Sequence, residues 1–531
     1  MAIENLSKEL SQFLKSQTTN SKVIQLASEI QNQFILGNTA ILNNETIDDP
    51  LISNDGTCGY IVQNNGKAGF RRFYNQELYI KNDFLNSNSL AINHRDLISA
   101  INSVLKILNL EIPTALDQQW QACLSSLHKS RFILTGGPGT GKTTTVIRMM
   151  LLYLTLDNTK NIALSAPTGK AANQMMHSIA QQLIDVDVPD ELKQRLQIKA
   201  QTIHRLLGYN NQTNKVKYNK NNPLPYDLVI IDESSMLDVS LTYALLQALK
   251  PKAQLILIGD KNQLPAVEAG NVFSDLCQLI NSDNVHDSSN LLNLIITEEV
   301  NQKIIPSYVE LTKNYRFTDD SLIAQMCRAL THKKTSILYE LKNTNALNWS
   351  DPQTKSEKKQ KLNEWYHSIS KEQSAILLSP VNNGPNSVAE LNDMAREILY
   401  NNHTTHENMP IMVTQNDYAL NIFNGDIGEL TLINNQWHVA LVIEGEQKHL
   451  QLQALPVWQQ ANAITIHKAQ GSEYDHVLIA IPNDVEINIL NNALLYTAIS
   501  RAKVSVTLWA NDKIVEKIIK TSKNRLTFLN N

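Results

Sequence analysis

Residues 131–154, RFILTGGPGTGKTTTVIRMMLLYL, decide the fold, because they contain an apolar strand, a glycine-rich turn and a helical run in that order. The central GGPGTGKT (136–143) satisfies the pattern G-x-x-x-x-G-K-[ST], and the flanking strand and helix are the context that this pattern requires. Backbone N–H groups of such a loop and the start of its helix surround a phosphate. We expect Lys142 to reach the β- and γ-phosphates of ATP and Thr143 to ligate Mg²⁺. The nucleotide-binding residues expected from this loop are Gly136, Gly137, Pro138, Gly139, Thr140, Gly141, Lys142, Thr143 and Thr144.

Further short apolar runs between residues 111 and 300, such as NIALSAP, DLVIIDE and QLILIGD, end in polar or small residues. Runs of this kind indicate parallel strands covered on both faces, and therefore a doubly wound α/β domain that binds its ligand at the carboxyl ends of the strands. Asp232 and Glu233 end one strand, where Asp232 can hold Mg²⁺ and Glu233 can polarise the attacking water. Gln263 follows another strand and is a candidate γ-phosphate sensor.

The rest of the chain divides by pattern. Residues 1–110 carry amphipathic helical patterns without a chemical motif, which predicts a mainly helical domain for packing or docking. A second set of strands begins at SAILLSP (374–380), and the frequent turns of 410–443 predict a small β insertion. The expected domains are 1–110, 111–300 with a hairpin or loop insertion at 209–226, and 301–531 with the β insertion at about 400–458.

The bulk composition says more about the cellular compartment of the protein than about its function. A net charge of −4 gives no electrostatic sign of nucleic-acid binding, although a local basic groove remains possible. The four scattered cysteines do not have zinc-site spacing, and they fit a reducing compartment best. The N-terminus lacks the apolar core of a signal peptide, and the apolar runs are too short to span a bilayer. We expect a cytoplasmic protein.

Seven further motifs appear in the order typical of superfamily 1 helicases. They are PTGKAA (167–172), QTIHRLLG (201–208), DES (232–234), GDKNQLP (259–265), LTKNYRF (311–317), HKAQGSEYD (467–475) and LLYTAISRAK (494–503). Over residues 110–510 the chain resembles the RecD family, the alpha subunits of exodeoxyribonuclease V, also called the RecBCD complex. The resemblance implies an α/β fold with two RecA-like P-loop motor domains, in which the β insertion corresponds to an SH3-like module and residues 209–226 fall where relatives carry a strand-separating pin.

The resemblance also assigns roles to individual residues. Gln119 corresponds to the adenine-recognising glutamine, Tyr315 to the residue that stacks on adenine, and Arg316 and Arg501 to arginine fingers. A guanidinium from the facing domain stabilises the transferring phosphoryl group only when the cleft closes. Gly471 and Glu473 are implied to approach the nucleotide, Glu473 as a ribose contact. The implied DNA contacts are Thr168, Lys170, Thr202, His204, Asn386, Thr465 and His467.

The loop in ITIHKAQGSEYDHV (464–477) is ambiguous from its residues alone. Its histidines, lysine and acids fit a metal site, an acid/base site or a solvated loop. The resemblance favours a coupling loop that contacts DNA at one end, through Thr465 and His467, and ATP at the other.

The leading hypothesis is an ATP-dependent 5′-to-3′ DNA helicase motor in a heterotrimer with RecB-like and RecC-like subunits. By resemblance, this complex repairs double-strand breaks by homologous recombination and degrades DNA. No separate nuclease constellation is present, so we expect the nuclease centre in another subunit. The alternatives are a stand-alone superfamily 1 helicase, of the long RecD-like or plasmid-transfer type, and a catalytically silent docking subunit. The intact motifs argue against the silent subunit.

Overall fold

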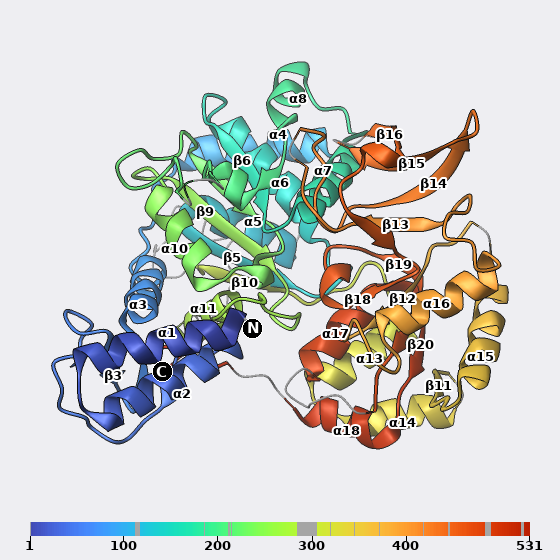
Figure 1. Cartoon of the computed structure of the whole chain (residues 1–531). Coiled ribbons are helices and arrows are strands. Elements are labelled where there is room, and N and C mark those ends of the chain that lie inside the picture. Colours follow the sequence, from blue (N-terminus) through green and yellow to red (C-terminus); the bar gives the residue numbers. More distant parts are fainter. Residues whose placement is uncertain are drawn as a thin grey trace.

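The strand that leads into the glycine-rich loop lies inside a parallel sheet. The computed structural model describes residues 2–530 except 112–116, 185, 211–212, 214, 284–304, 319, 345, 371, 418, 444–445, 484–489 and 522–524 (Figure 1). Six described strands form the first sheet in the order β10-β5-β9-β8-β6-β7, and every pairing is parallel. Their bounds are β5 (Arg131–Gly136), β6 (Ile162–Ala166), β7 (Gln201–Thr202), β8 (Leu228–Ile231), β9 (Gln254–Gly259) and β10 (Tyr308–Leu311).

Helices cover both faces of this sheet, because β5 alternates between two cores. Phe132 and Leu134 point into one core and Ile133 into the other, as the two-residue period of a strand requires. The first core contains α4 (His94–Ile107), α5 (Gln118–His128), α6 (Lys142–Leu156) and α7 (Gly169–Ile184). The second contains α3 (Arg71–Leu85), α10 (Val239–Ala248) and α11 (Val272–Asp283). Shorter helices are α8 (Asp190–Leu196), α9 (Ile203–Leu206) and the 3-10 turn η1 (Ser234–Met236).

The second half of the chain repeats this plan with a second parallel sheet. Its described strands run in the order β11-β20-β19-β12-β18. Their bounds are β11 (Asn348–Ser350), β12 (Ala375–Ser379), β18 (Ala463–Thr465), β19 (Tyr474–Ala480) and β20 (Ala502–Trp509). The helices are α13 (Leu322–Thr331), α14 (Thr335–Asn343), α15 (Lys355–His367), α16 (Val388–Leu399), α17 (Asn492–Ile499) and α18 (Asp512–Lys520), with the 3-10 turn η4 (His467–Ala469).

A small antiparallel sheet with its own core is inserted between α16 and β18, as the turn-rich pattern predicts. It projects from the second motor domain toward α7 of the first (Figure 1). Its strands are β13 (Pro410–Val413), β14 (Ile427–Ile433), β15 (Gln436–Ile443), β16 (Glu446–Gln451) and β17 (Trp458–Gln460), with the 3-10 turn η3 (Leu452–Ala454). The β14–β15 hairpin turns at Asn434 and Asn435, whose φ angles of 50° and 60° suit a tight hairpin turn.

The N-terminal region is helical, but it also contains a small sheet that the sequence analysis did not predict. Helices α1 (Ala2–Gln17) and α2 (Ser21–Ile35) lie beside strands ordered β1-β4-β3-β2. The bounds are β1 (Ile41–Leu42), β2 (Ile52–Ser53), β3 (Ile61–Asn64) and β4 (Lys67–Phe70). Asn65 and Gly66, with φ of 49° and 71°, form the turn between β3 and β4.

The expected domain boundaries differ from the structure at three places. Helix α4 packs in the core of the first motor domain, so that domain begins before residue 111. Strand β10 pairs with β5, so the first domain extends beyond residue 300. The C-terminal segment 525–530, which we name the tail, returns to the first and N-terminal domains rather than staying with the second, and the C-terminus lies beside the N-terminal helices (Figure 1).

Candidate functional site

A cavity of about 370 Å³ lies where β5, β8 and β9 end and the second motor domain faces them. Parallel strands present their carboxyl ends at one edge, so residues distant in sequence meet there. The predicted residues that line this cavity are Pro138, Gly139, Thr140, Gly141, Lys142, Thr143, Thr144, Asp232, Glu233, Gln263, Tyr315, Arg316, Gly471, Glu473 and Arg501. Both motor domains therefore contribute to one cavity.

The glycine-rich loop has the geometry of a phosphate-binding loop. Gly139 and Gly141 have φ of 76° and 82°, in the left-handed region that glycine adopts without strain. Helix α6 begins at Lys142, so its unpaired N–H groups point toward the cavity. The Lys142 ammonium donates hydrogen bonds to the carbonyls of Gly136 and Gly137 at 2.9 and 3.1 Å, which holds it across the loop.

Gln119 lies against this loop, whereas Gln118 does not. A Cβ added at Gly141 would lie 2.1 Å from Gln119 Nε2, which itself donates to the Thr140 carbonyl at 3.3 Å. Gln118 instead accepts a hydrogen bond from the backbone of Thr312 at 2.7 Å. Of these two glutamines, Gln119 is therefore the one that contacts the glycine-rich loop.

Two carboxyl groups approach the phosphate-binding loop at the end of β8. Burial raises the pKa of Asp232 above its usual range, and burial together with Asp232 raises the pKa of Glu233. Glu233 also has φ of 50°, a conformation that costs a non-glycine residue energy and is common at functional sites. The hydroxyl of Thr143 and the carboxylate of Asp232 are hard oxygen donors in the same cavity, a donor set that suits Mg²⁺.

The segment after β9, residues 260–270, connects the cavity to the second motor domain, and we name it the sensor loop. Asp260 Oδ2 accepts hydrogen bonds from Gln263 Nε2 at 3.4 Å and from the Tyr496 hydroxyl of α17 at 2.9 Å. The backbone of Leu264 donates to Thr497 Oγ1 at 2.9 Å and accepts from Gln470 Nε2 at 3.1 Å. Gln263 Oε1 is buried and has no hydrogen-bond partner within the described chain.

Arg316 and Glu473 bind each other in this cavity. Their side chains form an ion pair at 2.7 Å. The expectation that Arg316 comes from the facing domain is wrong, because its segment follows β10 of the first sheet and the Tyr315 N–H donates to the Gly139 carbonyl at 2.8 Å. Tyr315 is 54% exposed, and the Lys313 ammonium lies over its ring, 5.0 Å from the centroid.

Arg501 is the arginine that the second motor domain contributes. It follows α17 and is only 4% exposed. Its guanidinium donates to the carbonyls of Thr497 and Ser472 at 3.1 and 3.3 Å, which aims it from the second sheet into the shared cavity.

The predicted DNA contacts of the first domain lie near the β insertion. Thr168 and Thr202 cap helices, because each hydroxyl accepts an N–H at 3.2 Å. Thr202 also lines a cavity of about 350 Å³ whose far wall includes Phe423 of the insertion. A Cβ at Gly169 would lie 2.4 Å from the Phe423 ring, so glycine permits this contact. His204 is exposed on α9.

Lys170 is the cation at the junction between the first domain and the insertion. Its ammonium is buried without a hydrogen-bond partner among the described residues, and burial lowers its pKa to about 8. The Asp426 carboxylate of the insertion opposes this shift, and burial raises the pKa of Asp426 to about 6. The two groups are paired electrostatically without a direct ion pair.

The structure places the predicted DNA residues of the second domain on different elements. Thr465 ends β18 and His467 begins η4. Asn386 is 5% exposed, and its Nδ2 donates to the Ile481 carbonyl at 3.0 Å. The prediction of Asn386 as a DNA contact is therefore wrong, because the side chain is buried and holds the loop after β12 against β19.

Sequence reasoning missed the residues that hold the site together. Asp260 lies in GDKNQLP (259–265) and Tyr496 in LLYTAISRAK (494–503). No pattern in either motif predicts that the phenol and the carboxylate bind each other across the two domains. Phe423 and Asp426 belong to the predicted β insertion, where nothing in their own segment indicates contact with Gly169 or Lys170. Arg525 lies outside every motif.

Comparisons with known proteins agree with this geometry. A family model described as an AAA domain matches residues 119–269, and one described as a UvrD-like helicase C-terminal domain matches 460–509. The RecBCD enzyme subunit RecD of Haemophilus influenzae is 30% identical, over 84% of this chain and 76% of that protein. The Buchnera aphidicola subunit RecD from the Acyrthosiphon pisum strain is 29% identical, over 91% of this chain and 86% of its own length.

Two further matches are more distant. The ATP-dependent RecD2 DNA helicase of Deinococcus radiodurans is 29% identical, over 73% of this chain but 48% of that protein. Among solved structures, the Pif1 helicase from Bacteroides has a TM-score of 0.44 at 17% identity, over 78% of this chain and 95% of that one. Among the described residues, no helix combines the length and apolar character needed to cross a membrane. The 30% identity to the Haemophilus influenzae subunit, over 84% of this chain and 76% of that protein, shows that the chain belongs to the RecD family of superfamily 1 DNA helicases and is a DNA-dependent, ATP-binding helicase.

Proposed function

We propose that the chain is the 5′-to-3′ motor subunit of a RecBCD-type complex with RecB-like and RecC-like partners, acting in double-strand break repair and DNA degradation. The observation that carries the proposal is the cavity shared by Lys142, Glu233, Gln263 and Arg501. It supports an ATP site whose chemistry requires residues from both motor domains.

In the proposed mechanism, the loop 136–144 and Gln119 bind the nucleotide, and Lys142 leaves its carbonyl partners to bind the β- and γ-phosphates. Thr143 and Asp232 would hold Mg²⁺, which supplies positive charge for the phosphate oxygens. Glu233 orients the attacking water, and Gln263 uses its unpaired Oε1 to position that water beside the γ-phosphate. Arg501 stabilises the negative charge that develops as the phosphoryl group transfers.

Arg316 and Glu473 form an ion pair with each other, and nucleotide binding would give each of them a new partner. A ribose hydroxyl that donates to Glu473 competes for the carboxylate and releases Arg316 toward the γ-phosphate. Tyr315 stacks on the adenine from the same segment. Gly471 has φ of 71°, in the left-handed region that glycine adopts without strain, and it lies beside Ala171 of the first domain.

We further propose that single-stranded DNA lies between the first motor domain and the insertion. The cavity beside Phe423, with Lys170 and Thr202 near it, supports this path, because such grooves combine cations and hydroxyls for phosphates with aromatic faces for bases. Thr168, His204, Thr465 and His467 would extend the contacts along the strand. The insertion would be the SH3-like module of the family, and 209–226, whose described residues include antiparallel bridges at Asn210–Lys215 and Asn219–Asn222, would be the pin.

The N-terminal domain would dock on the RecC-like partner, and the nuclease centre would lie in another subunit. A stand-alone helicase like the Deinococcus radiodurans relative is the second candidate. The alignment favours the subunit, because it extends over 84% of this chain for the Haemophilus influenzae subunit and over 73% for the stand-alone enzyme.

The test uses the full chain alone and co-purified with candidate RecB-like and RecC-like subunits. We expect DNA-stimulated ATP hydrolysis that Lys142→Gln abolishes, unwinding of duplexes with a 5′ tail, and stable association that requires the N-terminal domain. Hydrolysis unaffected by Lys142→Gln would refute the motor. Strong unwinding by the chain alone, with no association, would favour the stand-alone helicase.

A further inference from the structure

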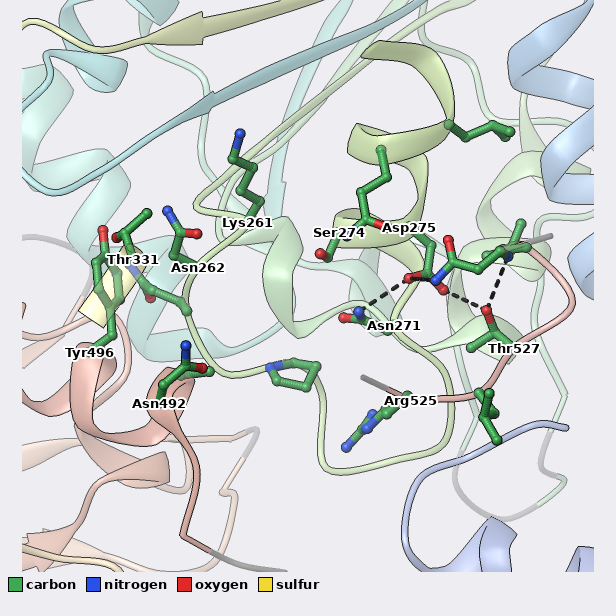
Figure 2. Close-up of a pocket in the computed structure, with 18 of the residues that line it drawn as sticks. Lys261, Asn262, Asn271, Ser274, Asp275, Thr331, Asn492, Tyr496, Arg525 and Thr527 are labelled. Carbon is green, nitrogen blue, oxygen red and sulfur yellow. Dashed lines mark hydrogen bonds between the residues drawn. The ribbon is translucent and has the colours of Figure 1, made fainter. Parts of the chain in front are cut away.

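The sensor loop also lines a second cavity, of about 660 Å³, and Gln263 lines both this cavity and the ATP cavity. Figure 2 shows the loop residues Lys261 and Asn262 between Tyr496 of α17 on one side and the tail residues Arg525 and Thr527 on the other. The beginning of the loop is held by α17, through Asp260 and Leu264. The end of the loop is held by the tail.

A single side chain makes the contact at the end of the loop. Arg525 donates to the carbonyls of Ala266 at 2.7 Å, Glu268 at 2.6 Å and Gly270 at 2.5 Å. These alternate carbonyls all turn toward one guanidinium. Gly270 has φ of 104°, which only glycine adopts readily, and its N–H donates to the Gly37 carbonyl of the N-terminal domain at 2.9 Å.

The chemistry of this contact requires arginine. Arg525 is 5% exposed, and no carboxylate forms an ion pair with it in the part of the chain that the structure describes. Burial lowers its pKa to about 10, so the side chain is still charged at neutral pH and needs acceptors. A planar guanidinium can serve three carbonyls at once, whereas an ammonium is a compact point charge. Without it the three carbonyls lose their common donor.

The tail is fixed in place independently of Arg525. Thr527 Oγ1 and Asn530 Nδ2 each donate to the Asp275 carboxylate at 2.7 Å, as Figure 2 shows for Thr527. The Phe528 N–H donates to Glu77 at 2.7 Å. The N–H groups of Thr39 and Ala40 donate to the Leu526 carbonyl at 3.0 Å. These bonds join the tail to α11 and the N-terminal domain, so the backbone that carries Arg525 is held in place by contacts other than its own.

From these contacts we propose that Arg525 is a positioning residue for ATP hydrolysis. By fixing the end of the sensor loop, it sets the position of Gln263 relative to the γ-phosphate, and it ties that position to the N-terminal domain. The proposal rests on the ATP site proposed above. Arg525 lines the second cavity and not the ATP cavity, so we expect it to affect turnover rather than nucleotide binding.

The experiment compares the full chain with Arg525→Ala, Arg525→Lys and the control Arg131→Ala. Arg131 also donates to backbone carbonyls, those of Ser130 and Ala253, and pairs with Asp83, but it stands at the start of β5, at the opposite end of that strand from the glycine-rich loop. Steady-state ATP hydrolysis with single-stranded DNA gives kcat and KM, fluorescence titration gives ADP affinity, and amide hydrogen exchange reports the sensor loop directly.

For Arg525→Ala we expect kcat to fall about 10- to 30-fold, less than the roughly 100- to 1000-fold loss of a donor that itself contacts the transition state, because Arg525 acts through the loop. KM for ATP and ADP affinity should stay within about threefold, because the phosphate-binding loop is untouched. Amide exchange in residues 264–270 should rise, and Arg525→Lys should recover part of kcat. Arg131→Ala should leave kcat unchanged.

Unchanged kcat or unchanged exchange in the sensor loop of Arg525→Ala would overturn the proposal, as would equal losses in Arg131→Ala. If the alanine variant does not fold, the lysine variant decides by the same comparison of kcat, KM and exchange. Failure of the proposed function would be recognised separately, because Lys142→Ala would then still hydrolyse ATP. Amide hydrogen exchange in the sensor loop of the Arg525 variants would still test the positioning role.

Discussion

Tyr496→Phe removes one hydroxyl from the contact between the two motor domains. That hydroxyl donates to Asp260 Oδ2 at 2.9 Å, and both side chains are buried. Burial and the Asp260 carboxylate raise the pKa of Tyr496 well above its usual value, so the phenol stays protonated and remains a donor. Phenylalanine keeps the ring, and therefore the packing, but leaves Asp260 Oδ2 with only the 3.4 Å contact from Gln263.

The size of the effect follows from the kind of bond. A buried hydrogen bond to a charged group contributes about 1.5–3 kcal/mol. If the loss falls wholly on the hydrolysis step, about 1.4 kcal/mol per factor of ten gives a decrease in kcat of about 10- to 150-fold. Because Leu264 keeps its two bonds to Thr497 and Gln470, the loop stays near its place, and we expect the lower part of that range, about 10- to 30-fold.

The assay is steady-state ATP hydrolysis across ATP concentrations with saturating single-stranded DNA. Tyr400→Phe is the matched control, since that buried hydroxyl accepts a bond from Asn462 Nδ2 at 3.1 Å outside the ATP cavity. Adding Gln263→Ala to Tyr496→Phe should cost little more, because both changes break one relay. Equal kcat losses in the two phenylalanine variants, or a rise in KM at constant kcat, would refute the reasoning.

Three other perturbations probe separate parts of the molecule. Glu233→Gln should slow hydrolysis about 100- to 1000-fold with ADP affinity unchanged, because an amide cannot take a proton from water, and a matching loss of ADP affinity in titrations would contradict that role. Lys170→Ala should weaken single-stranded DNA binding and make the slope of log affinity against log salt shallower by about 0.7, whereas an unchanged slope would exclude a phosphate contact. Glu77→Gln should flatten the pH dependence of thermal stability: burial raises the Glu77 pKa from 4.5 to about 8, so the folded chain holds a proton that the unfolded chain has released, and wild-type stability falls as pH rises through that interval. The same fall in the glutamine variant would disprove this account.

The ATP site was predictable because its residues follow strands of one kind. Lys142, Asp232 and Gln263 each come after an apolar run, and a parallel sheet brings such positions to one edge. The sequence motifs of the second domain added Arg501 and Glu473 by resemblance. The ion pair between Arg316 and Glu473 was not predictable, because each was assigned to the nucleotide and not to the other.

Long-range pairings account for the main errors. Strand β10 joins β5 from about 170 residues away, and nothing in its own four residues specifies that neighbour. The β3–β4 hairpin, in contrast, could have been predicted, because the dipeptide Asn65-Gly66 is typical of a two-residue hairpin turn. The resemblance assigns Asn386 to the DNA contacts, but only the tertiary structure reveals that its amide is buried.

The position of the tail has a consequence for the order in which the protein is made. Leu529 is fully buried in the core of the first motor domain, and the tail supplies hydrogen-bond donors to the buried carboxyl groups of Glu77 and Asp275. Domains usually fold as they leave the ribosome, from the N-terminus onward. Here the core of the first motor domain is complete only after residues 525–530 have been synthesised, which is after the whole second motor domain. Loss of these residues would therefore leave its defect in the domain that is made earlier.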